Sequence, residues 1–130
     1  MGQAVLKAVQ EADGLQLVGA IVVRGGADTG TLVGLPATGI CVETDLVAAL
    51  AHLKPDVMID FTRPDAVFSN VMAALKHKVS PVVGTTGLSD EQKRVIANAC
   101  VENETPAFIA PNFAIGAVLL MVLAQQAAKY

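Results

Sequence analysis

Residues 55–64 read PDVMIDFTRP, and this stretch decides the fold. Its apolar run at residues 57–61 predicts a buried strand. Pro64 suits the first position of a helix, because the N–H that proline lacks would be unpaired there anyway. Apolar residues then recur every four positions along one face of that helix; they are Val67, Val71 and Leu75. The stretch therefore predicts a strand followed directly by a helix.

The pattern continues toward the C-terminus. Residues 81–83 predict another short strand. Ser89 and Gln92 have the spacing of a capping box, which predicts a helix that begins there and runs to about residue 99. Residues 107–110 predict the last strand. This half of the chain thus alternates strands and helices.

The N-terminal half shows the same alternation. Residues 2–12 predict a helix, residues 15–23 a strand covered on both faces, and residues 40–42 a short strand. Thr44 or Asp45 can cap a further helix. Because parallel strands joined by helices take right-handed crossovers, the whole pattern predicts the α/β class with a doubly wound parallel sheet.

The composition fits one domain of 130 residues with an aliphatic core, since 53% of the residues are apolar and none is Trp. The net charge of −3, with scattered Lys and Arg, argues against nucleic acid as a partner. The apolar run at residues 117–124 is shorter than the ~18 residues of a membrane span. We therefore expect a buried helix there and no membrane partner.

The cysteines predict neither a disulfide nor a metal site. Cys41 and Cys100 are far apart and match no metal-ligand spacing. The N-terminus has no signal-peptide pattern. These features favour a reducing cytoplasm, where both cysteines would be plain apolar residues.

Four loops follow predicted strands, and ligands of doubly wound sheets bind beyond the carboxyl ends of the strands. The loops are residues 23–26, 61–64, 84–87 and 110–113. The loop of residues 84–87, Gly-Thr-Thr-Gly, offers backbone N–H groups and two hydroxyls that suit a ribose or a nicotinamide amide. Gly and Thr are also common in plain turns, so the loop alone leaves both interpretations open.

Other residues in these loops also allow two interpretations. Asn112 and Phe113 could present an amide and an aromatic face to a flat ring, or could serve as a helix cap and a core anchor. Arg24 could bind the 2′-phosphate of NADPH, or lie in solvent. Asp60 could be a general base, but its carboxylate more simply accepts hydrogen bonds that hold the loop. We assign no catalytic role to His52 or His77.

Five motifs in this order resemble those of one enzyme family. They are Met1-Gly2-Gln3, Asp28-Thr29-Gly30 with Leu32 and Gly34, Asp60-Phe61-Thr62-Arg63-Pro64, Val83-Gly84-Thr85-Thr86-Gly87, and Pro111-Asn112-Phe113-Ala114-Ile115-Gly116. In this combination the chain resembles the N-terminal part of the 4-hydroxy-tetrahydrodipicolinate reductases, also called dihydrodipicolinate reductases. The resemblance extends over essentially the whole chain.

The resemblance implies a Rossmann domain, residues 1–130, that binds NADPH or NADH in a cytoplasmic oxidoreductase of lysine and diaminopimelate biosynthesis. The full-length enzyme would be a homotetramer that reduces a small dicarboxylate. The resemblance places neither a catalytic residue nor a metal ligand in this chain. The implied cofactor-binding residues are Met1, Arg24, Phe61, Thr62, Gly84, Thr85, Thr86, Ala110, Pro111, Asn112 and Phe113.

The chain departs from the family pattern in three ways. The opening strand and most of the glycine-rich loop are missing before Met1, so we expect an incomplete pyrophosphate site, unpaired strand edges, and weak stability or self-association. The family's His-His and Lys segment and its substrate domain are absent after Tyr130, so we expect no turnover by this chain alone. Ala114 replaces a common Ser. In addition, the non-acidic Val23 disfavours NADH.

Two alternatives remain open at this stage. One is a noncatalytic nucleotide-binding or oligomerisation module of the Rossmann type, whose loops bind cofactor without chemistry. The other is a different Rossmann dehydrogenase, such as a homoserine or aspartate-semialdehyde type. Those enzymes do not share the loops at residues 60–62 and 111–113 as a set.

Overall fold

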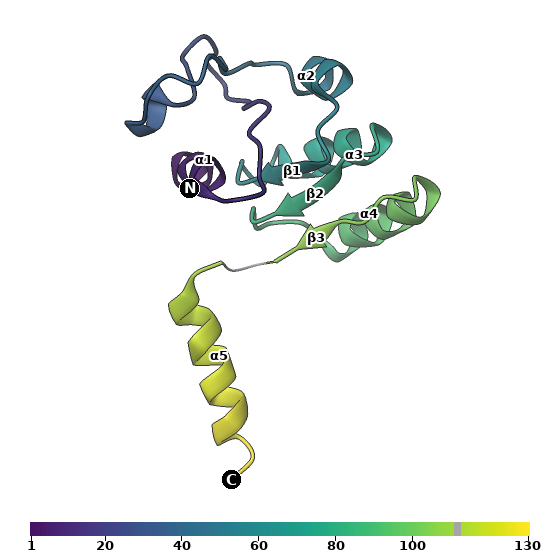
Figure 1. The fold of residues 1–130 in the computed structure, drawn as a ribbon. Helices are drawn as coiled ribbons and strands as arrows, with labels where there is room; N and C mark the ends of the chain where they lie inside the picture. Colours follow the sequence, from purple (N-terminus) through teal and green to yellow (C-terminus); the bar gives the residue numbers. More distant parts are fainter. Residues whose placement is uncertain (111–112) are drawn as a thin grey trace.

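A computed structural model of the chain describes residues 1–110 and 113–130. Figure 1 shows a small sheet with helices around it, and one helix that extends away from it. In chain order the elements are α1 (Gly2–Glu11), the 3-10 helix η1 (Thr31–Val33), α2 (Leu46–Leu53), β1 (Val57–Asp60), α3 (Val67–Lys76), β2 (Ser80–Val83), α4 (Asp90–Glu102), β3 (Phe108–Ile109) and α5 (Ile115–Ala127).

The three strands form one parallel sheet in the order β1, β2, β3. Asp60 pairs with Val83, and Val83 pairs with Ile109, so the carboxyl ends of the strands lie in register. The connections run through α3 and α4, as the sequence pattern predicts. This arrangement confirms the α/β, Rossmann-like class.

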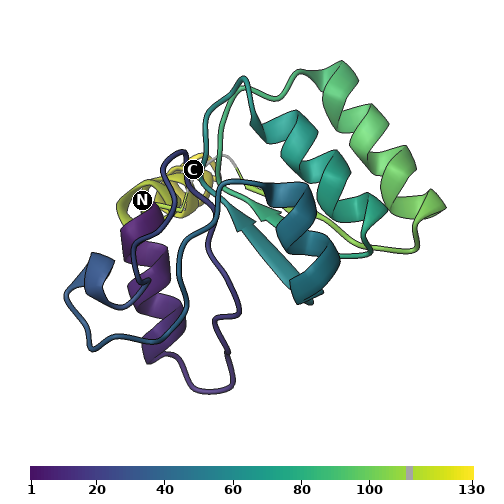
Figure 2. The same ribbon diagram turned by 90° about the horizontal axis from the view of Figure 1, so that it is seen from above.

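Helix α3 supplies the centre of the core. It packs on β1 and β2, between α2 and α4 (Figure 2). The predicted apolar face is fully buried: Val67, Val71 and Leu75 each have 0% of their surface exposed. Burying side chains of this size stabilises the fold by roughly 1.5–3 kcal/mol each. The four-residue repeat in the sequence therefore identified the core-facing side of α3 correctly.

Two predicted helix caps are present. The Asp45 carboxylate accepts a hydrogen bond from the backbone N–H of Ala48 at 3.0 Å. Ser89 and Gln92 form a complete capping box at the start of α4. Each cap satisfies N–H groups that a helix N-terminus otherwise leaves without partners.

The strands predicted at residues 15–23 and 40–42 are wrong. In the described chain each of these segments takes part only in an isolated bridge to a residue outside both of them: Ile21 pairs with Glu43, and Cys41 pairs with Asp28. Residues 15–19 form no backbone hydrogen bond within the described chain. The segment after α1 passes on the side of β1 that β2 does not occupy (Figures 1 and 2). An apolar, β-branched sequence becomes a strand only when a neighbouring backbone pairs with it, and here no such neighbour is described.

The expectation that residues 117–124 form a buried helix is half wrong. Residues 117–124 are helical, within α5, but none of its residues is buried. No other described element packs on α5, which points away from the sheet (Figure 1). The sequence of α5 is apolar on every side, which is typical of a buried helix. Burial also requires a surface that covers the helix, and no described element supplies one. In the described part of the chain, no helix has the length and hydropathy needed to cross a bilayer.

One face of the sheet is also open. Side chains alternate between the faces along each strand. Val83 and Ile109 point toward the α3 and α4 side and join its core. Val57, Ile59 and Phe108 point the other way and remain 49%, 42% and 58% exposed. The expected weak stability or self-association of the isolated chain stays a prediction, and these surfaces supply a physical reason for it.

Candidate functional site

Two loops lie side by side at the carboxyl end of the sheet. One follows β1 and contains Phe61 to Pro64, and the other follows β2 and contains Gly84 to Gly87. They are neighbours because β1 and β2 are paired in parallel and end in register. This is the position where ligands bind in open α/β sheets.

The carboxylate of Asp60 joins the two loops. Asp60 is 3% exposed. Its Oδ1 accepts hydrogen bonds from the backbone N–H and the hydroxyl of Thr62, at 2.9 and 2.8 Å, and from the hydroxyl of Thr85 at 2.8 Å. Its Oδ2 accepts a hydrogen bond from Nδ2 of Asn70 at 2.9 Å. The carboxylate therefore holds the loops together, as the sequence favoured, and has little capacity left for a general-base role.

Two glycines allow the loops to interlock. A Cβ atom at Gly84 would overlap the ring of Phe61. A Cβ atom at Gly87 would lie 2.7 Å from Cβ of Pro64, and Gly87 also has a φ of +100°, which side chains rarely adopt. Glycine is therefore required at both positions by close approach of the neighbouring loop, beyond any role in a turn.

An aromatic cluster brings a third loop into the site. The rings of Phe61 and Phe113 meet edge to face with centroids 5.3 Å apart, and Phe113 meets Phe108 at 6.4 Å. Such pairs stabilise by about 0.5–1.5 kcal/mol beyond the burial of area. Phe113 is thus an anchor, one of the two roles that the sequence allowed, and its ring remains 42% exposed. Predicted site residues Pro111 and Asn112 lie outside the described residues.

The second loop contains backbone donors that have no protein acceptor in the described chain. Within the described chain, the backbone N–H groups of Thr85, Thr86 and Gly87 donate to no protein acceptor. The side chain of Thr86 is exposed and forms no hydrogen bond there. The prediction of two available hydroxyls is wrong for Thr85, because that hydroxyl is bonded to Asp60. The loop therefore has three backbone amides and one hydroxyl without a protein partner in the described chain.

The structure gathers most of the predicted site residues but not all of them. Phe61, Thr62, Ala110 and Phe113 lie with the residues 84–86 around the ends of the strands, where the N–H of Ala110 donates to the carbonyl of Val83. In the described chain no hydrogen bond or ion pair links Met1 or Arg24 to these loops. Arg24 is exposed and has no partner in the described chain. This position is compatible with both interpretations of the sequence, a phosphate ligand or a side chain in solvent.

Asn70 and Asp28 hold loops in place through contacts that the sequence alone did not predict. Asn70 lies one turn inside α3, so only the contact with Asp60 reveals its role. Asp28 organises the loop after Arg24 by accepting hydrogen bonds from the N–H groups of Gly30 and Gly39, both at 2.8 Å. Short Asp side chains commonly bond backbone amides in this way, and the Asp28-Thr29-Gly30 run was the only available signal.

The hydrogen bonds to Asp28 affect its titration. Burial pushes the pKa of Asp28 upward, but the backbone N–H groups of Thr38, Thr31, Gly39 and Gly30 outweigh that effect together. They hold the pKa of Asp28 below its ordinary value, because they bond the charged form.

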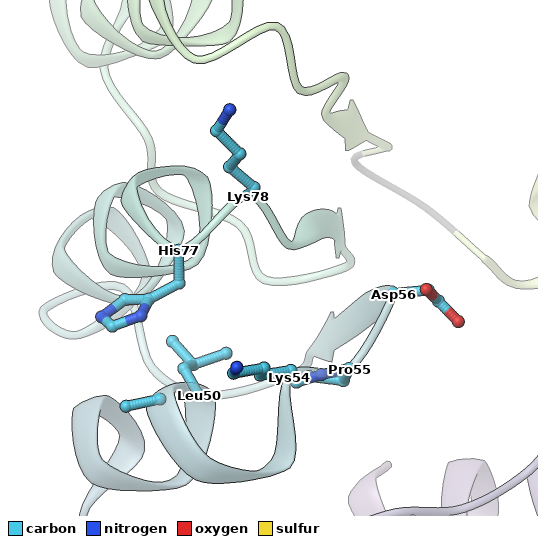
Figure 3. A pocket seen from close by; sticks show the side chains of 7 residues that line it. Leu50, Lys54, Pro55, Asp56, His77 and Lys78 are labelled. Atoms are coloured by element: carbon cyan, nitrogen blue, oxygen red, sulfur yellow. The ribbon is translucent and has the colours of Figure 1, made fainter.

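A separate cavity lies at the other end of the sheet. It has a volume of about 340 Å³ and is lined by residues from the ends of α2 and α3 and the start of β1 (Figure 3). The lining residues are Leu50, Ala51, Lys54, Pro55, Asp56, His77 and Lys78. No group of three His, Cys, Asp or Glu residues in the described chain could hold a metal ion.

The sheet order, the crossover helices and the donor-rich loops beyond the carboxyl ends of the strands define a Rossmann-like α/β domain of the nucleotide-binding class. Residues 1–113 match the family model described as dihydrodipicolinate reductase, N-terminus. The chain therefore belongs to the dihydrodipicolinate reductase family and corresponds to the N-terminal part of its members.

Individual relatives agree with this assignment. The chain is 38% identical over 131 residues to the 4-hydroxy-tetrahydrodipicolinate reductase of Moorella thermoacetica, and 43% identical over 132 residues to that of Desulfitobacterium hafniense. Each alignment covers 100% of this chain and 49% of the relative. The chain thus spans about half the length of these relatives.

A solved structure shares the fold. It is a dipicolinate-bound dihydrodipicolinate reductase from Paenisporosarcina sp. TG-14, with a TM-score of 0.77 and 33% sequence identity. The superposition covers 100% of this chain and 51% of that one. The resemblance first drawn from five short motifs is therefore confirmed at the level of the family and the fold.

Proposed function

We propose that this chain is the cofactor-binding part of an NAD(P)H-dependent 4-hydroxy-tetrahydrodipicolinate reductase. The observation that carries the proposal is the pair of interlocked loops at the carboxyl ends of β1 and β2, with three backbone N–H groups left open. Open N–H groups and a hydroxyl on a rigid support suit a polar ligand such as the carboxamide and ribose of a nicotinamide nucleotide. Membership of the family makes this ligand class the natural candidate.

The proposed binding residues divide into two groups. Gly84, Thr85 and Thr86 contact the nicotinamide half, the first two by backbone and Thr86 by its hydroxyl as well. Phe61, Thr62 and the 110–113 loop complete that side. Arg24 binds the adenosine 2′-phosphate, because an exposed guanidinium without a protein partner is suited to a phosphate. Met1 lies near the pyrophosphate.

The wider role belongs to the whole protein. The bound nicotinamide nucleotide supplies a hydride for reduction of a small dicarboxylate on the route to lysine and diaminopimelate. We propose that the groups that bind this substrate and supply a proton come from outside residues 1–130. The described loops then bind and orient the cofactor without themselves contributing an acid or a base.

Calorimetric titration of the chain with NADPH and NADH tests the proposal. We expect weak binding of both, because the pyrophosphate site is incomplete, and tighter binding of NADPH than of NADH. Arg24→Ala should weaken the binding of NADPH by about tenfold, as expected for the loss of a charge-assisted contact, and leave the binding of NADH unchanged. Arg94→Ala is the matched control, because Arg94 is also exposed but pairs with Glu91 on α4. Absence of binding by the parent chain would contradict the proposed function, and equal effects of both variants would contradict the role of Arg24.

A further inference from the structure

We propose that Asp60 is a positioning residue that sets the geometry of the two cofactor loops through Thr85. The inference rests on the proposed function and deepens it. It assigns no direct ligand contact to the Asp60 carboxylate, and it assigns the hydroxyl of Thr85 to the protein rather than to the ligand.

Both oxygens of the Asp60 carboxylate accept hydrogen bonds, three at Oδ1 and one at Oδ2. Four hydrogen bonds reach its two oxygens, and a carboxylate has about four lone-pair sites. No cation pairs with Asp60 in the described chain, so these neutral donors alone compensate its burial. A buried carboxylate is tolerated only when it is bonded in this way. The groups that donate to Asp60 are therefore fixed in position together with its carboxylate.

The donors to Asp60 come from three different parts of the fold. Thr62 lies in the first loop, Thr85 in the second and Asn70 in α3, so one side chain ties both loops to the helix behind the sheet. The backbone repeats the connection, because the N–H of Gly84 donates to the carbonyl of Asp60 at 2.9 Å.

The bond between Thr85 and Asp60 affects the three backbone amides that have no protein acceptor. The N–H groups of Thr85, Thr86 and Gly87 follow immediately after Gly84, so the Thr85 to Asp60 bond sets their direction. A ligand site loosened by about 1 Å loses much of its function, because orientation is part of binding and catalysis. Breaking this bond should therefore weaken the nicotinamide half of the site and spare the adenosine half.

The main variant is Thr85→Val, which keeps the shape of the side chain and removes the hydroxyl. Thr85→Ser restores the hydroxyl. Thr105→Val is the matched control: Thr105 is 5% exposed, similar to the 8% of Thr85, and its hydroxyl donates to the carbonyl of Asn103 near the amino end of β3. Titrations of the full chain use NADPH and, for the adenosine half alone, adenosine 2′,5′-bisphosphate.

We expect Thr85→Val to weaken NADPH binding by about tenfold, because the loop amides lose the orientation that the bond to Asp60 gives them. The bisphosphate should bind as before, Thr85→Ser should bind NADPH within about twofold of the parent, and Thr105→Val should change neither ligand. Equal loss of both ligands would overturn the inference, because it would indicate a general structural defect.

A double variant separates positioning from direct contact. If Thr85 acts through Asp60, then Asp60→Ala combined with Thr85→Val should bind NADPH no more weakly than Asp60→Ala alone. Fully additive losses would overturn the inference, because they would mean that the Thr85 hydroxyl contacts the cofactor independently.

Hydrogen exchange tests the connection without any ligand. In Thr85→Val the amides of Thr62 and Gly84 should exchange about tenfold faster, while those in the middle of α3 should not change. Unchanged exchange at both loop amides would overturn the inference even if NADPH binds. Failure of the parent chain to bind NADPH, with faster exchange in the variant, would instead overturn the proposed function and with it the assignment of these loops to a cofactor.

Discussion

The two ends of the sheet differ in what they offer a ligand. The amino end has a cavity of about 340 Å³ with two lysines, Lys54 and Lys78, in its lining. The carboxyl end has no cationic side chain in its two interlocked loops except Arg63, which is paired with Asp65. It has instead a buried carboxylate that orients both loops.

The side chains at the amino end do not converge. Figure 3 shows Lys78 and Asp56 pointing away from the space between His77 and Leu50. Lys54 and His77 are the C-caps of α2 and α3, and the positive charge of Lys54 offsets the dipole of α2. The difference teaches that a cavity lined by lysines is not by itself a ligand site, because donors that are not held in place lose more entropy on binding.

The largest effect is expected at the carboxyl end, from Gly84→Ala. The added Cβ would overlap the ring of Phe61, which Phe113 holds from another side. Overpacking of this kind costs about 1–3 kcal/mol. We expect that decrease in the free energy of unfolding in urea, and a loss of NADPH binding of at least about tenfold. The control is Gly116→Ala in α5, where a Cβ meets nothing within 4 Å. Similar behaviour of the two variants would contradict the interlocked loops.

The capping box beside the second loop should have the next largest effect. Ser89→Ala removes the acceptor of the Gln92 N–H at the start of α4 and should lower the free energy of unfolding by about 1 kcal/mol. Chemical denaturation measures it. Ser69→Ala is a control, because Ser69 lies within α3 and its hydroxyl donates to the carbonyl of Ala66. A larger loss for the control would show that the cap contributes little.

At the amino end, a substitution should stabilise the chain without affecting nucleotide binding. Lys78 has a φ of +60°, which is strained for a residue with a side chain. Lys78→Gly should raise the free energy of unfolding by about 0.5–1 kcal/mol and leave the affinity for NADPH unchanged. Lys76→Gly, within α3, should instead lower it by about 1 kcal/mol. Weaker NADPH binding by Lys78→Gly would mean that the cavity at this end takes part in binding.

The smallest effect concerns pH and the loop after Arg24. The pKa of Asp28 is lower in the folded chain than in the unfolded one, so its stabilising contribution is complete above the unfolded value of about 4. The contribution is lost as the pH falls below that value through the folded pKa. Asp28→Asn should therefore reduce stability near neutral pH and flatten the decline below about pH 4. Parallel stability curves of parent and variant would exclude this role.

The sequence predicted elements that depend on local signals. The Val67, Val71 and Leu75 repeat identified the buried face of α3, and the Ser89 and Gln92 pair located the start of α4. These signals suffice because helix hydrogen bonds and caps lie within a few residues of each other. The strand predicted at residues 15–23 was wrong, because a strand depends on a partner elsewhere in the chain. The burial predicted for the helix at residues 117–124 was wrong, because burial depends on a covering surface.

The site was predicted in part for the same reason. The predicted strand ends located the loops, and the Gly and Thr residues indicated which hydrogen-bonding groups the loops contain. The hydroxyl of Thr85 was assigned to a ligand because its partner, Asp60, is 25 residues away in the sequence. Asn70 was missed because an Asn inside a helix carries no signal of its own. Contacts between distant residues required the structure.

The most direct test of the account is a map of backbone amide chemical shifts on addition of NADPH. We expect the largest changes at Phe61, Thr62 and the amides of residues 84–87, with a second group at Arg24. Largest changes at Lys54, His77 and Lys78, or no changes anywhere, would contradict the claim that the carboxyl end of this sheet is the cofactor site.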